Sequence, residues 1–116
     1  MTIRRLAPEA RLAGAVVHGN TVYLAGQVAD DTSLDGEGQM RDILAQIDAL
    51  LAEAGTGKRH LLSVQIFIQD FADFAGMNRA WDSWIDRDHR PARATVQAKL
   101  ANPAWRIEVT GVAAIP

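Results

Sequence analysis

The chain has 116 residues, of which 48% are hydrophobic, with a net charge of -2 and an isoelectric point near 5.8. This length predicts a single domain spanning residues 1–116, and its slightly acidic charge, with Lys and Arg scattered, argues against nucleic-acid binding. The chain has no cysteine, which excludes disulfides, thiolate catalysis and cysteine-based metal sites.

Two further classes are disfavoured by the arrangement of residues. No apolar run approaches the ~20 residues that span a bilayer, and residues 1–8 lack the apolar segment of a secretory signal. We therefore expect no membrane partner and a cytoplasmic location. The three histidines lack the spacing of metal ligands, so no metal is expected.

The first half of the chain predicts a hairpin followed by a helix. Two short β-rich runs, residues 13–17 and 21–25, are separated by His-Gly-Asn, a tight-turn sequence. From residue 40 to residue 54, apolar side chains recur at three- and four-residue steps, which is typical of an amphipathic helix. Gly55 follows at the position where a glycine commonly ends a helix.

The second half predicts a strand, a helix and two more strands. Apolar and polar residues alternate over residues 62–69, as in a strand with one buried face. A second amphipathic helix begins near residue 74 and ends before Pro91, which disfavours helix in the residue preceding it. Two strands, residues 93–100 and 105–114, follow and are joined by a four-residue loop.

This order, ββαβαββ, predicts an α+β fold. We expect a two-layer sandwich in which both helices cover one face of a mostly antiparallel sheet. Apolar residues near both termini, including residues 112–115, suggest that the other sheet face is apolar too. We expect other copies of the chain to cover that face.

Arg93 and Glu108 are the candidate functional residues. Arg93 begins a strand, and its planar guanidinium matches a carboxylate with two hydrogen bonds. If the last two strands pair around their loop, Gln97 lies nearest Glu108, and Arg93 lies roughly 13 Å farther along. This distance predicts a small-molecule site at a subunit boundary. From spacing alone, a solvated surface arginine and an exposed strand glutamate remain alternatives.

Four motifs in order resemble the RidA proteins, the YjgF-type reactive imine and enamine deaminases. Residues 19–27 are similar to the early Gly-Asn to Ser-Gly-Gln hairpin of that family, and residues 71–78 to its Asp-Phe helix start with a later Asn. Residues 91–96 resemble its Pro-Ala-Arg motif, and residues 107–109 its late Ile-Glu strand. The resemblance covers nearly the whole chain.

The resemblance implies a chorismate-mutase-like fold and homotrimers with clefts between subunits. It implies hydrolysis of 2-imino acids, or their enamine tautomers, to 2-oxo acids and ammonia, without a cofactor. Arg93 would bind the substrate carboxylate, and Glu108 would position the attacking water. Groups near Thr95 and Gly26 would complete the polar contacts, and Asn78 would line the cleft.

The chain departs from the best-studied branch of that family at three positions. Leu12 stands where that branch has a tyrosine, Ala25 where it has a serine, and Thr95 where it has a cysteine. These changes predict a more apolar substrate pocket and leave a second interpretation open, a non-catalytic trimer that binds a small carboxylate. A third, endoribonuclease activity, is disfavoured because the chain lacks a basic, aromatic-rich surface.

Overall fold

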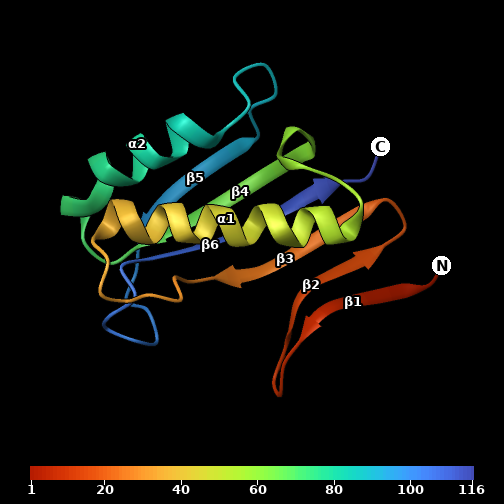
Figure 1. Cartoon of the computed structure of the whole chain (residues 1–116), viewed down its shortest axis with the longest axis horizontal. Coiled ribbons are helices and arrows are strands. Elements are labelled where there is room, and N and C mark those ends of the chain that lie inside the picture. Colours follow the sequence, from red (N-terminus) through yellow and green to blue (C-terminus); the bar gives the residue numbers. More distant parts are fainter.

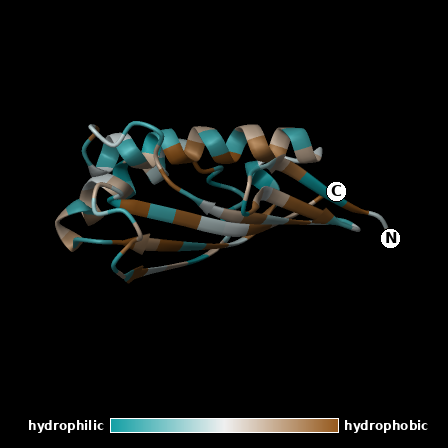
Figure 2. Ribbon diagram, turned by 90° about the horizontal axis from the view of Figure 1, so that it is seen from below, coloured by the Kyte–Doolittle hydropathy of each residue, from teal (hydrophilic) through white to brown (hydrophobic).

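The structure, a computed structural model, describes residues 1–116 and has two layers: one six-stranded sheet and two helices on one of its faces (Figures 1 and 2). The main elements in chain order are β1 (Ile3–Pro8), β2 (Ala13–His18), β3 (Thr21–Gln27), α1 (Gly36–Ala54), β4 (Leu61–Ile68), α2 (Phe74–Trp84), β5 (Ala92–Gln97) and β6 (Ile107–Ala114). Every strand pair is antiparallel except β4 with β5, so the predicted α+β sandwich with a mostly antiparallel sheet is confirmed.

The first strand, β1, was not predicted. It pairs antiparallel with β2 at one edge of the sheet (Figure 1). Only Leu6 of its six residues is buried, and Arg4 and Arg5 are exposed. An edge strand that buries a single side chain lacks the alternation that identifies a half-buried strand.

The pairing predicted for the last two strands is wrong. The sheet order is β1-β2-β3-β6-β4-β5, so β4 separates β5 from β6. Gln97 pairs with Ile68 and Glu108 pairs with Phe67, so Gln97 and Glu108 are not neighbours. The physical reason is α2: a helix between two strands is long enough to carry the chain back and make β5 parallel to β4. The segment between β5 and β6 then returns to the middle of the sheet.

The core lies between the sheet and α1. The apolar stripe predicted for α1 is buried, with Ile43 and Ile47 almost fully covered in the same cluster as Ile66. Asp35 caps the start of α1 by accepting a hydrogen bond of 2.8 Å from the backbone of Gly38. Gly55 ends it in the left-handed conformation, with φ of 93°. Neither helix is long and apolar enough to cross a membrane.

The second face of the sheet has no helix over it (Figure 2). Tyr23 and Val96 are about half exposed, at 50% and 44%. A hollow of about 510 Å³ lies in the middle of the sheet and is lined mainly by β3, β4, β5 and β6. One copy of the chain therefore leaves apolar side chains of its sheet uncovered.

Candidate functional site

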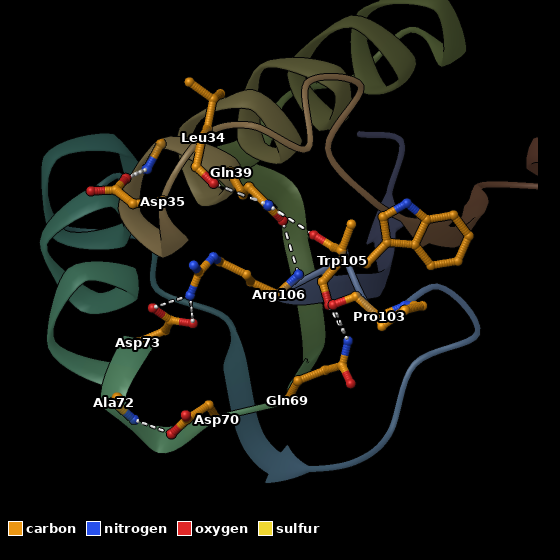
Figure 3. Close-up of polar contacts among 12 residues, drawn as sticks. Leu34, Asp35, Gln39, Gln69, Asp70, Ala72, Asp73, Pro103, Trp105 and Arg106 are labelled. Carbon is orange, nitrogen blue, oxygen red and sulfur yellow. Dashed lines mark hydrogen bonds and ion pairs between the residues drawn. The ribbon is translucent and has the colours of Figure 1, made fainter.

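The start of β6 is fixed by a cluster of four polar side chains, Gln39, Gln69, Asp73 and Arg106 (Figure 3). The backbone N–H of Arg106 donates to Oε1 of the fully buried Gln39 at 2.9 Å, and its guanidinium pairs with Asp73 at 3.2 Å. The backbone N–H of Gln69 donates to the carbonyl of Arg106 at 3.1 Å. Glu108, two residues farther along, therefore projects from a backbone that is held from several sides.

Gly26 lies directly against Glu108. A Cβ added to Gly26 would lie 2.8 Å from Cδ of Glu108 and would overlap its carboxylate. The pairing of β3 with β6 shifts between Leu24 and Gln27, and the side chain of Gln27 donates to the carbonyl of Ala25 at 3.0 Å. Residues 25 and 26 thus form an irregular segment of β3, which leaves space for the carboxylate of Glu108. The Glu108 carboxylate makes no hydrogen bond or ion pair with the protein.

Arg93 is the second residue of β5 and is held by an aromatic ring. It pairs with Val64, whose side chain is buried beneath the helices, so Arg93 points to the same face. Its guanidinium carbon lies over the ring of Trp81 in α2, 5.0 Å from the centroid. The guanidinium makes no salt bridge. A cation–π contact needs no carboxylate, and no protein group accepts a hydrogen bond from this guanidinium, so its N–H donors remain free.

Two more of the predicted residues lie near Arg93. Thr95 pairs with Ile66 and faces the helices, two residues along β5 from Arg93. Its Oγ1 is buried and has no hydrogen-bond partner. Asn78 is half-buried on α2, three residues before Trp81, at a spacing that places both on one side of the helix. The unit of α2 and β5 therefore brings three predicted site residues into one region.

The seven predicted site residues form two separate groups in one chain. The arginine group contains Arg93, Thr95 and Asn78, and the glutamate group contains Leu12, Ala25, Gly26 and Glu108. Leu12 is 53% exposed in the turn between β1 and β2, roughly 19 Å across the sheet from β5 when four strand spacings are counted.

Arg93 and Glu108 also face opposite sides of the sheet. Arg93 shares the helix-covered face with Val64, whereas Glu108 pairs with Phe67 on the uncovered face. Two strand spacings and three residues along the strand separate their backbones by roughly 14 Å. The register differs from the predicted one, but it also excludes a direct ion pair between the two residues.

Sequence reasoning missed Trp81, the side chain that supports Arg93. It is 6% exposed and packs between α2 and the sheet edge. The order strand, helix, strand over residues 61–97 was the available signal, because such a unit places the helix against both of its strands.

An ion-pair bridge fixes α2 relative to α1. Glu37, in the first turn of α1, pairs with Arg41 at 2.8 Å and with Arg79 of α2 at 2.9 Å. Hydrogen bonds from Arg41 and then Arg79 hold the pKa of Glu37 below its ordinary value of 4.5. Because Arg79 is two residues before Trp81, this bridge helps to place the ring on which Arg93 rests.

Comparison with known proteins identifies the relatives of this chain. The family described as Endoribonuclease L-PSP matches residues 2–115. The RutC family protein YoaB of Escherichia coli (strain K12) is 45% identical over 115 residues, which cover 99% of this chain and all of that protein. A RutC family protein of Haemophilus influenzae is also 45% identical, over 97% of this chain and 98% of its own length.

Solved structures agree with these sequence matches. NMB1025 of Neisseria meningitidis, a member of the YjgF family, superposes with a TM-score of 0.95 at 39% identity, covering 98% of this chain and 95% of that one. An uncharacterized protein of Pseudomonas aeruginosa superposes equally well, with a TM-score of 0.95 at 44% identity over 97% of this chain and 98% of that one. The chain therefore belongs to the L-PSP endoribonuclease family, the family of the YjgF and RutC proteins.

Proposed function

We propose that this protein hydrolyses reactive 2-imino acids, or their enamine tautomers, to 2-oxo acids and ammonia in clefts between subunits of a homotrimer. The observation that carries the proposal is the state of Arg93. Its guanidinium lies over the ring of Trp81, and no protein carboxylate occupies its donors. A cation that is fixed in place but unpaired is suited to bind a small carboxylate.

The proposed reaction needs one cation and one base. Arg93 binds the carboxylate of the imino acid with two hydrogen bonds and thereby orients the C=N carbon. Glu108 accepts a proton from a water molecule while the water oxygen bonds to that carbon, and then passes this proton to the imine nitrogen. The hydroxyl group of this intermediate then gives its proton, by way of Glu108, to the amino nitrogen; the C–N bond breaks as the C=O bond forms, ammonia leaves and the 2-oxo acid remains, and no oxidant or reductant is consumed.

The separation of the two groups supports a site shared between copies of the chain. The arginine group of one copy and the glutamate group of the next would together contact one substrate, with head-to-tail contacts closing a ring of three. The uncovered face of the sheet supports such an assembly, because exposed apolar side chains gathered on one face favour association. A monomer in light scattering at micromolar concentration would contradict this part of the proposal.

The deciding experiment measures the decay of an imine generated from an amino acid. Wild-type protein should accelerate the decay, and Arg93→Ala should lower kcat/KM by about 100-fold because the bidentate contact is lost. Arg93→Lys should recover only part of the loss, since lysine keeps the charge without the planar fork. Arg5→Ala, an arginine on the far edge strand, is the matched control. An unchanged decay rate with wild-type protein would rule out the deaminase function.

The alternative is a trimer that binds a small carboxylate without turning it over. It is favoured by the absence of a side-chain hydroxyl at Leu12 and Ala25, because fewer polar groups then act on the substrate. Calorimetry with 2-oxo acids separates the two functions. A binding protein would lose affinity in Arg93→Ala, would change little in Glu108→Ala, and would leave imine decay unaffected.

A further inference from the structure

Three arginines lie near the side chain of Trp81. Arg93 lies over the ring, 5.0 Å from its centroid. A hollow of about 360 Å³ adjoins the same side chain and holds two more arginines. The residues that line this hollow are Trp81, Asp82, Ile85, Arg87 and Arg90.

These arginines are not neutralised by the protein. Arg87, Arg90 and Arg93 form no ion pair. Asp82 borders the hollow but pairs with none of them. Two more acids follow α2: Asp86 pairs with His89 at 3.2 Å, and Asp88 pairs with no arginine. The hollow therefore presents unpaired guanidinium groups beside the cation that we assign to the substrate carboxylate.

The spacing of Arg90 and Arg93 suits a ligand with two anionic ends. Three extended residues separate their backbones by roughly 10 Å, and Pro91 restricts the chain between them. Arg93 lies over the ring of Trp81, and Arg90 lines the hollow that Trp81 also lines, so both long side chains lie near one rigid ring. Each guanidinium can bind a carboxylate with two parallel hydrogen bonds.

We propose that Arg90 determines specificity by binding a second carboxylate, so that the preferred substrates are 2-imino dicarboxylic acids, the imines of amino acids with acidic side chains. This inference rests on the proposed function, in which Arg93 binds the carboxylate next to the C=N carbon. Arg90 then binds the carboxylate at the far end of the side chain, and the hollow beside Trp81 accommodates it.

The test compares kcat/KM for the imines of glutamate, aspartate and leucine in wild-type protein, Arg90→Ala and Arg5→Ala. Wild type should favour the two dicarboxylates, and Arg90→Ala should lower the glutamate-to-leucine ratio about tenfold, mainly through KM. Arg90→Glu should lower the ratio further. Arg5→Ala should keep the wild-type ratio, which separates a local contact from an effect of net charge. Equal ratios in Arg90→Ala and wild type would overturn the inference.

A binding measurement keeps this test independent of catalysis. If wild-type protein hydrolyses no imine, the proposed function fails, and calorimetry with 2-oxoglutarate and with the 2-oxo acid of leucine then tests Arg90 alone. Tighter binding of 2-oxoglutarate that is lost in Arg90→Ala would support the second carboxylate contact. Equal affinities for the two 2-oxo acids would refute it.

Discussion

The two charged groups of the candidate site are held in different ways. Arg93 lies on an edge strand and rests on the side chain of Trp81, which comes from a separate helix. Glu108 lies on a central strand, against the backbone of Gly26, and follows a segment clamped by Gln39. The acid is therefore placed by the backbone of the sheet, whereas the cation is placed by the packing of α2.

The comparison predicts the largest effect at Gly26. In Gly26→Ala the new methyl group overlaps the Glu108 carboxylate, so the acid must move away from its position. A displacement of about 1 Å at a reacting group is enough to lower kcat by about 100-fold. Stability should change little, because Gly26 is exposed and the methyl group meets the free end of a flexible side chain. Imine decay and thermal unfolding measure the two effects.

Gly57→Ala provides the control for that substitution, because a Cβ at Gly57 meets no atom within 4 Å. It should leave both kcat and unfolding close to the wild-type values. Full activity in Gly26→Ala would show that the role of Glu108 does not depend on its close approach to Gly26.

A smaller effect is expected when the ring that supports Arg93 is replaced. Trp81→Phe leaves a smaller ring beneath the guanidinium, and the contact is worth about 0.5–1 kcal/mol at a partly exposed site. KM for an imino acid should rise several-fold while kcat changes little. Trp84→Phe is the matched control, because Trp84 supports Lys58 at 5.1 Å and not Arg93. An equal rise of KM in both variants would contradict a specific role for Trp81.

Thr95 allows stability and ligand binding to be separated. Its buried hydroxyl has no partner, so Thr95→Val should stabilise the free protein by about 1 kcal/mol. If a ligand takes that hydrogen bond, the same variant should bind 2-oxo acids several-fold more weakly. In the control Thr110→Val, a hydroxyl that donates to Leu24 at 2.6 Å is lost, so stability should fall. Stabilisation of Thr95→Val without any loss of affinity would remove Thr95 from the site.

The smallest effect concerns the bridge that positions α2. The pKa of Glu37 is lowered in the folded protein by Arg41 and Arg79, so its contribution to stability is complete above about pH 4.5 and is lost as the pH falls through the folded value. Glu37→Gln should therefore unfold at a lower temperature than wild type at pH 7. The difference should shrink below pH 4.5, which thermal melts across this range can follow. A difference in unfolding temperature that stays constant with pH would show that the charge of Glu37 does not cause it.

Much of the fold was predictable because its signals are local. The apolar stripe of α1 and the turn between β2 and β3 can be read within a few residues of sequence. The position of β5 could not be read in that way, since it depends on the crossover through α2 to a strand about thirty residues earlier. The strand β1 escaped prediction because Leu6 is its only buried residue.

The candidate site, too, was predictable only where its signals are local. Resemblance of short motifs singled out Arg93 and Glu108 as candidates, and their separation in one chain was anticipated. That they face opposite sides of the sheet follows from pairings with Val64 and Phe67 on β4, which the sequence does not reveal. The requirement for glycine at residue 26 likewise depends on the neighbouring Glu108 carboxylate, which the sequence does not place there.

The position of Arg93 on an edge strand also affects the tendency of the protein to aggregate. An unpaired strand at the rim of a sheet can recruit the strand of another molecule, and charged side chains or prolines discourage this. The opposite rim, β1, carries Arg4, Arg5 and Pro8, whereas β5 carries Arg93 as its only charge. Removing Arg93 should therefore promote aggregation as well as abolish binding, and turbidity measured beside activity will distinguish the two losses.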